Sequence, residues 1–394
     1  MTMPAESGSR GPRVCFPFIG DDLGGSHISA IKLVKGLVRD GFDVSVVIQQ
    51  ADGPLAEYLR AEKVDYDVLE IPRDAVRSTV AGLARVARAV PSVVSYIRRN
   101  SFDLVHTNDG WTHLQWGISS RLAGAKLIWH HRGDPDARAT NLVGPLVAHR
   151  LLAVSRFALP RSPILPVAKR ARVIHSPFDH PTGENDRRSA HAMLAAEIGV
   201  PPETRILGYF GGLIERKRPL LFVDILHRLL QAAPSRAVVG CLFGVSAPGG
   251  RDFAAECVQR ARELGIGQSI HMMGFRRPVE PYMSGCDILL IPAMGEPFGR
   301  TLIEAMLLGT PVIATAHGGN PEAITNGVNG ILVEPESADA FVPPLEFLLD
   351  DPVEYDRISQ TARCMALNHY GADRHVRSVE AVYRELLPER HGRA

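Results

Sequence analysis

The sequence contains no long apolar segment and almost no net charge. No apolar run reaches the roughly 20 residues needed to cross a membrane, and the first residues contain no apolar stretch of the kind found in signal peptides. Lys and Arg number 44 against 43 Asp and Glu, so the charge gives no reason to expect a nucleic-acid partner. We therefore expect a cytoplasmic protein.

Cysteine is scarce as well, and its distribution excludes two further classes of protein. The five cysteines are odd in number, scattered, and mostly placed within apolar segments: Cys15, Cys241, Cys257, Cys286 and Cys364. This pattern is typical of reduced core residues in a reducing compartment rather than of a disulfide framework. No set of Cys and His has the spacing of a zinc site.

A length of 394 residues, 45% of them hydrophobic, predicts two domains of ordinary size. Short apolar runs alternate with longer amphipathic stretches, which is typical of βαβ units around a parallel sheet. The expected strands of the first series are Val14–Ile19, Val44–Ile48, Val64–Ile71, Leu104–Thr107, Lys126–His130, Leu151–Ser155 and Arg172–Ser176. Those of the second are Ile206–Phe210, Ala237–Phe243, Ser269–Met273, Asp287–Pro292, Pro311–Thr315 and Gly330–Val333.

These series predict an α/β protein with two Rossmann-like, doubly wound domains, over residues 12–180 and 195–370. Residues 177–188 carry Pro, Gly, Asn and charges without periodicity, so we place the linker there. Two such domains are expected to face a cleft, with ligands at the carboxyl ends of their strands. The final segment, 371–390, has helical spacing and could cap either domain, the N-terminal one included.

Two helices of the first half carry more specific expectations. Ser26–Arg39 has one apolar stripe, with Ser26 as the expected N-cap. Val76–Arg99 is rich in arginine and holds Pro91, which we expect to interrupt it. We favour packing of its apolar face on the sheet with solvated arginines; peripheral contact with an anionic inner membrane face stays open. Its arginines are Arg77, Arg85, Arg88, Arg98 and Arg99.

The most informative stretch reads CDILLIPAMGEPFGRTLIEAMLLGTPVIAT, from Cys286 to Thr315. It predicts a strand, a bent loop, a helix over Arg300–Leu308 and a second strand. A helix that starts after a glycine offers unpaired backbone N–H groups and a positive dipole end, which suit a diphosphate. Glu296 and Glu304 could accept hydrogen bonds from sugar hydroxyls. From spacing alone, Arg300 and Glu304 could equally form a surface pair, and Glu296 could simply be favoured near a helix start.

This stretch closely resembles the EPFGxxxxEA signature of GT4-like retaining glycosyltransferases of GT-B fold, where two glutamates stand eight residues apart as Glu296 and Glu304 do. The resemblance implies that the first glutamate, with the backbone just after it, contacts the donor sugar. It implies that the second holds the ribose hydroxyls of the nucleotide. The donor-binding residues implied here are Glu296, Phe298, Gly299, Arg300, Thr301 and Glu304.

Other landmarks of the second half are similar to the same family. ILGYFGGLIERKRP, from Ile206 to Pro219, resembles the first strand of its second domain and a basic loop that neutralises the donor diphosphate. Many members carry an arginine directly after the glycine, where this chain has Gly212 or Leu213, so we assign that charge to Arg216 and Lys217. Without the resemblance, a solvated basic turn would explain both cations. Phe275 follows a strand where relatives hold the nucleotide base.

In the first half, Asp21–Ser26 resembles the glycine-rich loop of the family. The resemblance implies that Gly24 and Gly25 face the donor diphosphate and the acceptor, although a tight turn alone could also require a glycine pair. The loop lacks the GxGxxG pattern, so it gives no support for a nicotinamide or flavin site.

KLIWHHRGD, from Lys126 to Asp134, places histidines where relatives have one that contacts the donor sugar. Strand alternation sends His130 and His131 to opposite faces, and we favour His131; a buried structural histidine, or a polar role for Arg132, stays open. Asp134 and Asp136 match the DxD pattern of metal-dependent transferases. We interpret them as a turn, because the resemblance implies basic groups and helix dipoles in place of a metal or other cofactor.

The resulting prediction is a retaining, metal-independent hexosyl- or related glycosyltransferase that uses a nucleotide-diphosphate sugar. The residues assigned to its catalytic set are Glu296, His131, Arg216 and Lys217. The acceptor could be a glycan, a lipid-linked molecule or a small molecule, and the oligomeric state is not indicated. An epimerase or hydrolase of the same fold, or a non-catalytic nucleotide-sugar-binding subunit, are the alternatives.

Overall fold

The computed structural model describes residues 11–21, 23–71, 79–179 and 186–387. The start of the expected arginine-rich helix, the middle of the expected linker and the last residues of 371–390 lie outside the described residues. The chain divides into two compact units. Unit 1 is the chain up to Pro177 together with the part from Ala372 onward, and unit 2 is Phe178–Gly371.

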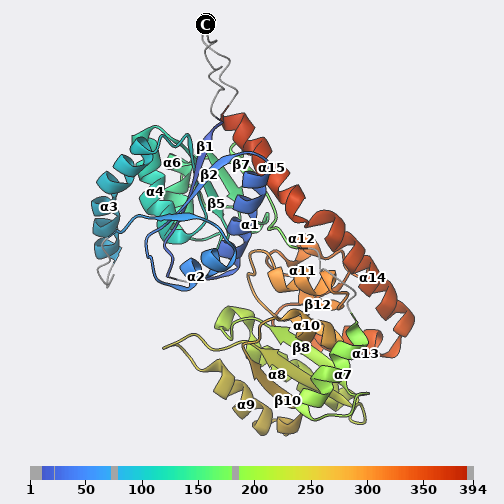
Figure 1. Cartoon of the computed structure of the whole chain (residues 1–394). Coiled ribbons are helices and arrows are strands. Elements are labelled where there is room, and N and C mark those ends of the chain that lie inside the picture. Colours follow the sequence, from blue (N-terminus) through green and yellow to red (C-terminus); the bar gives the residue numbers. More distant parts are fainter. Residues whose placement is uncertain (1–10, 22, 72–78, 180–185, 388–394) are drawn as a thin grey trace, which may run out of the picture. The chain divides into compact units, whose positions relative to one another are not determined.

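Unit 1 is built on a seven-stranded sheet among its described residues, in the order β3-β2-β1-β4-β5-β6-β7. Figure 1 labels four of these strands, β1, β2, β5 and β7. The strands are β1 (Arg13–Phe18), β2 (Asp43–Ile48), β3 (Tyr66–Val68), β4 (Leu104–Thr107), β5 (Lys126–His131), β6 (Arg150–Ala153) and β7 (Ala171–Val173). All these pairings are parallel. The chain order reverses between β1 and β4, so the loops after these two strands lie at a topological switch point, where doubly wound domains bind ligands.

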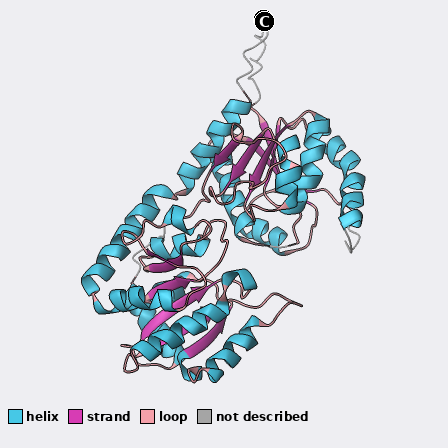
Figure 2. Cartoon of the chain, turned by 180° about the vertical axis from the view of Figure 1, so that it is seen from behind, coloured by secondary structure: helices cyan, strands magenta, loops and turns pink. Residues whose placement is uncertain are grey.

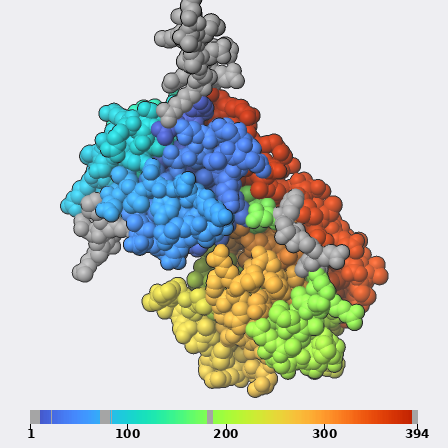
Figure 3. All heavy atoms as spheres, viewed as in Figure 1, coloured from blue at the N-terminus to red at the C-terminus, as the bar shows by residue number. Residues whose placement is uncertain are grey.

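Helices cover this sheet because each has one apolar face to bury. They are α1 (Gly25–Arg39), α2 (Pro54–Ala61), α3 (Thr79–Arg99), α4 (Gly110–Ala123), α5 (Arg138–Leu142), α6 (Gly144–Val147) and α15 (Ala372–Leu386). Helix α15 belongs to unit 1 and lies beside α1, as Figures 1 and 3 show. Val376, Val379 and Tyr383 join the core of β1, β2 and α1, and Val376 lies where a side chain at Gly36 would clash.

Two local expectations in unit 1 are wrong. Helix α1 is capped by Gly24 rather than Ser26, because the Gly24 N–H donates to Nδ1 of His27 at 3.1 Å. Helix α3 runs through Pro91 without interruption. An internal proline costs about 3 kcal/mol, but Val86 and Val93 on either side of it are buried, so tertiary packing holds the helix together. In the part of the chain that the structure describes, no helix is both long and apolar enough to cross a membrane.

Unit 2 has a six-stranded sheet among its described residues, in the order β10-β9-β8-β11-β12-β13. Figure 2 draws the strands in magenta with the helices in cyan around them. The strands are β8 (Arg205–Phe210), β9 (Val238–Phe243), β10 (Ile270–Gly274), β11 (Ile288–Ile291), β12 (Val312–Thr315) and β13 (Ile331–Val333). Its helices are α7 (Arg187–Ile198), α8 (Pro219–Ala232), α9 (Phe253–Glu263), α10 (Glu280–Gly285), α11 (Arg300–Leu307), α12 (Asn320–Ala323), α13 (Val342–Asp350) and α14 (Pro352–His369). All pairings are again parallel. The predicted pair of Rossmann-like domains is confirmed.

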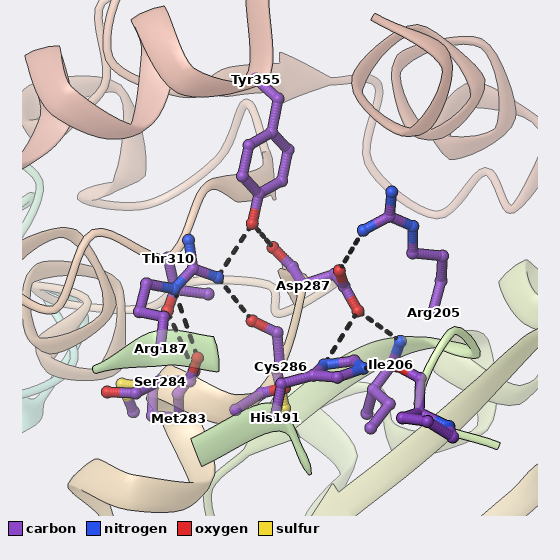
Figure 4. Close-up of polar contacts among 12 residues, drawn as sticks. Arg187, His191, Arg205, Ile206, Met283, Ser284, Cys286, Asp287, Thr310 and Tyr355 are labelled. Carbon is purple, nitrogen blue, oxygen red and sulfur yellow. Dashed lines mark hydrogen bonds and ion pairs between the residues drawn. The ribbon is translucent and has the colours of Figure 1, made fainter. Parts of the chain in front are cut away.

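Hydrogen bonds of Arg187 and Asp287 fix the start of β11 in unit 2 (Figure 4). The Arg187 guanidinium donates to the carbonyl oxygens of Cys286 at 2.8 Å and Gly309 at 2.7 Å. The carboxylate of Asp287, 7% exposed, accepts from the N–H of Ile206 at 2.7 Å and from Arg205 at 2.8 Å. Since buried carbonyls and carboxylates are costly without donors, these bonds hold β11 against β8 and set where its carboxyl end lies.

Candidate functional site

The carboxyl ends of β8 and β11 carry the principal polar residues of unit 2. These strands are hydrogen-bonded neighbours at the position where the strand order reverses. The loop after β8 leads through a short 3-10 turn, Glu215–Lys217, into α8, and the loop after β11 leads into α11. The N–H of Met294 donates to the carbonyl of Arg216 at 2.8 Å, so the two loops are joined by their backbones. The switch point of unit 2 therefore brings together residues about 80 positions apart.

Glu296 is the centre of this cluster, with two cations around it. Nη1 of Arg216 donates to Oε2 of Glu296 at 2.8 Å, and Nζ of Lys217 lies 3.9 Å from the same oxygen. The Glu296 side chain is 14% exposed and that of Lys217 19%, whereas Arg216 is 40% exposed. Partial burial strengthens such contacts, so the cluster keeps three charges in a defined arrangement and an overall charge of +1.

Gly211 makes room for one of these cations. Its φ is +140°, and a Cβ atom placed there would lie 2.6 Å from Nζ of Lys217. A larger residue would therefore displace the lysine from its place beside Glu296. The glycine after β8 is required by the position of Lys217 and by its own backbone conformation.

A second glycine pair supports the backbone of Glu296. The N–H of Gly319 donates to the carbonyl of Glu296 at 2.7 Å, and Nδ1 of His317 accepts from the N–H of Gly295 at 2.8 Å. A Cβ atom on Gly318, whose φ is +66°, would lie 2.6 Å from the carbonyl oxygen of Glu296. The turn after β12 thus packs directly against the loop after β11, and only glycine allows this approach.

Helix α11 begins next to this cluster. Gly299 is its N-cap and supplies no side-chain hydrogen bond, so the first N–H groups of the helix depend on other partners. Arg300 forms an ion pair with Glu304 at 3.0 Å, one turn apart, and its guanidinium lies 4.6 Å from the centre of the Phe178 ring. Thr301 is half-buried in the first turn. The arrangement suits an anion at the start of α11.

Two predicted donor contacts occupy unlike positions in unit 2. Phe298 is 4% exposed and packs with Tyr370, with ring centres 5.5 Å apart. Phe275, directly after β10, is 71% exposed. Phe298 thus fills the core beneath the site loop, and Phe275 is open to a ligand; both assignments as donor contacts stay predictions.

The loop after β1 in unit 1 contains the other predicted glycine pair. Gly24 has φ −120° and ψ 178°, an extended conformation that any residue adopts. A Cβ atom there would meet only Nδ1 of His27, at 4.0 Å. Neither the turn nor its neighbours require glycine at this position. A ligand that approaches the backbone closely would require it, which leaves the predicted role for Gly24 and Gly25 open to test.

The two histidines at the end of β5 are both buried. Nε2 of His131 is 2.8 Å from the carbonyl oxygen of Asp134, and its Nδ1 is 3.0 Å from the hydroxyl of Thr140. Burial lowers the pKa of His131 below its usual value. His131 is therefore a neutral imidazole with both ring nitrogens engaged inside unit 1, and its contact with a donor stays a prediction. Asp134 and Asp136 lie in a turn, where the Asp136 N–H donates to Oδ1 of Asp134 at 2.8 Å.

His130 belongs to a buried polar network that the sequence did not reveal. Its Nδ1 lies 3.0 Å from Nε2 of His106 and 3.3 Å from Nη2 of Arg132. Nδ1 of His106 lies 2.6 Å from the hydroxyl of Tyr383 on α15, and His375 of the same helix stacks on His130. The signal in the sequence was a histidine one residue before the end of each of the neighbouring strands β4 and β5. Among the described residues, no three His, Cys, Asp or Glu side chains are placed to hold a metal ion.

Comparisons with known proteins point the same way as this geometry. Residues 194–365 match the family described as Glycosyl transferases group 1, and residues 24–177 match the Glycosyl transferase 4-like domain. The D-inositol 3-phosphate glycosyltransferase of Corynebacterium glutamicum is 30% identical over 378 residues, which cover 86% of this chain and 87% of that protein. The same-named enzyme of Corynebacterium aurimucosum is 32% identical over 157 residues, 39% of this chain and 37% of its own. The structure of Anabaena HepE in complex with UDP-glucose superposes with a TM-score of 0.79 at 23% identity, covering 95% of this chain and 99% of HepE.

Proposed function

Because the chain belongs to the GT4-like glycosyl transferases group 1 family, we propose that it transfers a hexose or related sugar from a nucleotide diphosphate to a small polar acceptor. The cluster of Arg216, Lys217 and Glu296 at the switch point of unit 2 is the observation that carries this proposal. Relatives named D-inositol 3-phosphate glycosyltransferases support a small-molecule acceptor. HepE, solved with UDP-glucose, makes UDP the first nucleotide to test.

In the proposed reaction, unit 2 stabilises the departing diphosphate. Negative charge grows on the leaving oxygens while the anomeric carbon becomes cation-like, so fixed positive groups lower the barrier most where that charge develops. Lys217 and Arg216 supply two such groups, and the uncapped start of α11 supplies backbone N–H donors. Glu296 orients both cations and can accept from a hydroxyl of the donor sugar.

The stereochemistry and the metal requirement follow from the same proposal. We expect the sugar to keep its anomeric configuration, as in the family that the signature resembles. We expect no divalent cation to be needed, because Arg216, Lys217 and the start of α11 would do the work of a metal beside the diphosphate. Glu304, ion-paired to Arg300 on α11, is the proposed acceptor for the ribose hydroxyls.

Nucleotide titration of the full chain tests the assignment. Calorimetry against UDP, GDP, ADP and TDP, with and without EDTA, is expected to give binding to one of them that EDTA does not change. Glu304→Ala and Lys217→Ala should each weaken that binding roughly 10-fold or more, the effect of losing a charged hydrogen bond. Glu354→Ala is the matched control, because Glu354 forms a similar Arg–Glu pair with Arg357 on the exposed face of α14.

Two results would count against the proposal. Unchanged affinity in both Glu304→Ala and Lys217→Ala would remove the site from the cluster of unit 2. Absence of binding to all four nucleotides would remove the nucleotide-sugar donor itself.

A further inference from the structure

Unit 1 contains a small hollow that the donor site does not use. It lies at the carboxyl ends of β1 and β2 and is closed by α3 and α4, with a volume of about 100 Å³. The polar residues around it are Asp21, Gln49, Arg85, Trp111 and Gln115. Ile19 and Asp21 belong to the loop after β1, one of the two loops at the switch point of unit 1, so the hollow lies beside the position where a ligand of that unit is expected.

Two buried amides form the inner wall of the hollow. Gln49 is 6% exposed and Gln115 1%. Nε2 of Gln49 donates to Oε1 of Gln115 at 2.7 Å. That bond fixes the orientation of both amides, and it uses the carbonyl oxygen of Gln115 rather than its side-chain N–H groups. The wall therefore offers hydrogen-bond donors in a fixed position.

Arg85 supplies the charge. Its guanidinium carbon lies 4.5 Å from the centre of the Trp111 ring, and this cation–π contact holds the charge over the indole. Nε of Arg85 is buried and has no hydrogen-bond acceptor among the described residues. A buried N–H without an acceptor is costly, so its presence here points to a ligand that supplies one.

Size and chemistry together select the kind of group that fits. About 100 Å³ corresponds to roughly three water molecules, which suits one oxyanion rather than a whole sugar ring. The planar fork of an arginine matches the oxygens of a phosphate or a carboxylate, and the Gln115 amide adds neutral donors. Asp21 is exposed at the rim, where a carboxylate would repel the oxyanion itself but can accept from a neighbouring hydroxyl.

We propose that this hollow binds the phosphate or carboxylate group of an acidic, hydroxyl-bearing acceptor, with Arg85 as its specificity-determining residue. Naming the ligand as the acceptor rests on the proposed transferase function, whereas the binding of an acidic polyol does not. The sugar-accepting hydroxyl then lies on the part of the molecule outside the hollow, near Asp21 and the loop after β1.

The test compares four probes on the full chain: glucose 6-phosphate, glucuronate, glucose and inorganic phosphate. Each is titrated by calorimetry, with and without saturating UDP or whichever nucleotide binds. Iodide quenching of tryptophan fluorescence gives a second readout, because Trp111 is 38% exposed while Trp116 and Trp129 are fully buried. Binding is expected to protect Trp111 from iodide.

We expect glucose 6-phosphate or glucuronate to bind at least 10-fold more tightly than glucose. Whichever of these two acidic sugars binds more tightly shows whether the hollow accepts a phosphate or a carboxylate. Tighter binding of the sugar phosphate than of inorganic phosphate would show that the polyol contributes. Arg85→Gln should remove this preference, and Arg88→Gln, an exposed arginine on the same helix, should keep it. Unchanged melting of Arg85→Gln ensures that the loss is not unfolding.

Three outcomes would overturn the proposal: glucose binding as tightly as the acidic sugars, Arg85→Gln retaining the preference, or none of the probes binding. Nucleotide affinity in Arg85→Gln separates the two proposals. If Arg85→Gln binds nucleotide as the unaltered chain does but still prefers acidic sugars, only the acceptor site fails. If no nucleotide binds to the unaltered chain, only the donor proposal fails.

Discussion

The two units stabilise their polar residues in opposite ways. All six buried histidines among the described residues belong to unit 1: His27, His106, His113, His130, His131 and His375. Unit 2 instead holds its candidate site with ion pairs that stay partly exposed, between Arg216 and Glu296 and between Arg300 and Glu304. A unit that buries neutral histidine rings is destabilised when those rings gain a proton. Ion pairs of Arg with Glu keep their charges until the pH falls to the pKa of the carboxylate.

The glycine pairs of the two units also differ, in whether the surrounding structure requires glycine. Gly318 must be glycine because its φ is positive and the Glu296 carbonyl lies against it. Gly24 has an extended backbone and open space beside it. The packing of unit 2 thus requires glycine at Gly318. The packing of unit 1 does not require it at Gly24, where the close approach of a ligand is the remaining reason for a glycine.

Acidification should give the largest difference between the units. Burial lowers the pKa of His106 and His130 well below the usual value, and the charge of Arg132 lowers each further. Burial lowers the pKa of His375 to about 3. In the unfolded chain these rings take up a proton below about pH 6.5, so unit 1 loses stability as the pH falls from there. At pH 5 His375 alone should cost about 2 kcal/mol, and His106 and His130 add to this.

Tryptophan emission measures this effect in unit 1 alone, because the three tryptophans of the chain, Trp111, Trp116 and Trp129, all lie there. Urea unfolding followed by emission should shift to lower urea between pH 7 and pH 5. His375→Gln should reduce that shift, and His191→Gln in unit 2 should leave it unchanged. An emission transition that does not move between these pH values would contradict the neutral histidine network.

Substitution of Gly318 should give the next largest effect, this time in unit 2. Gly318→Ala forces a side chain into the left-handed region and against the Glu296 carbonyl, which should cost about 2–3 kcal/mol. The displaced Glu296 should also lose its hold on Arg216, so nucleotide affinity should fall. In urea unfolding, circular dichroism should show a transition at lower urea, while the tryptophan transition of unit 1 keeps its midpoint. If the variant is as stable as the unaltered chain, the loop after β11 adapts to the new side chain.

Gly24→Ala should have the smallest effect on stability and is the sharpest test of the comparison. With an extended backbone and only Nδ1 of His27 near the new Cβ atom, at 4.0 Å and without a clash, the change should stay within about 0.5 kcal/mol. If a ligand approaches this backbone, nucleotide or acceptor affinity should nevertheless fall. Equal affinities for Gly24→Ala and the unaltered chain would leave the glycine without a binding role.

The elements of the fold could be predicted from the sequence with few errors. Each expected strand overlaps an observed one, such as Leu104–Thr107, and the helix expected within residues 371–390 is α15. The errors were the N-cap of α1 and the break at Pro91. The ring of His27, in the first turn of the helix, caps the backbone in place of the expected serine, and buried neighbours outweighed the local cost of the proline.

The candidate site could be predicted only in part. Glu296 and its two cations were identified from sequence motifs, because residues at the ends of neighbouring parallel strands share one edge of a sheet. The hollow with Arg85 and Trp111 was not predicted, because Arg85 appeared only as one arginine of a basic helix. Its partner Trp111 lies on α4, and no periodicity reports which residues of two helices face each other.

The sequence by itself determined the two parallel sheets, the family and the residues that follow β8 and β11, because these depend on local periodicity and short motifs. Tertiary structure alone decided that α15 packs in unit 1, that six histidines are buried there, and that Gly318 but not Gly24 is sterically required. Burial and close contact arise between segments far apart in the chain. Their energies therefore appear only once the packing is known.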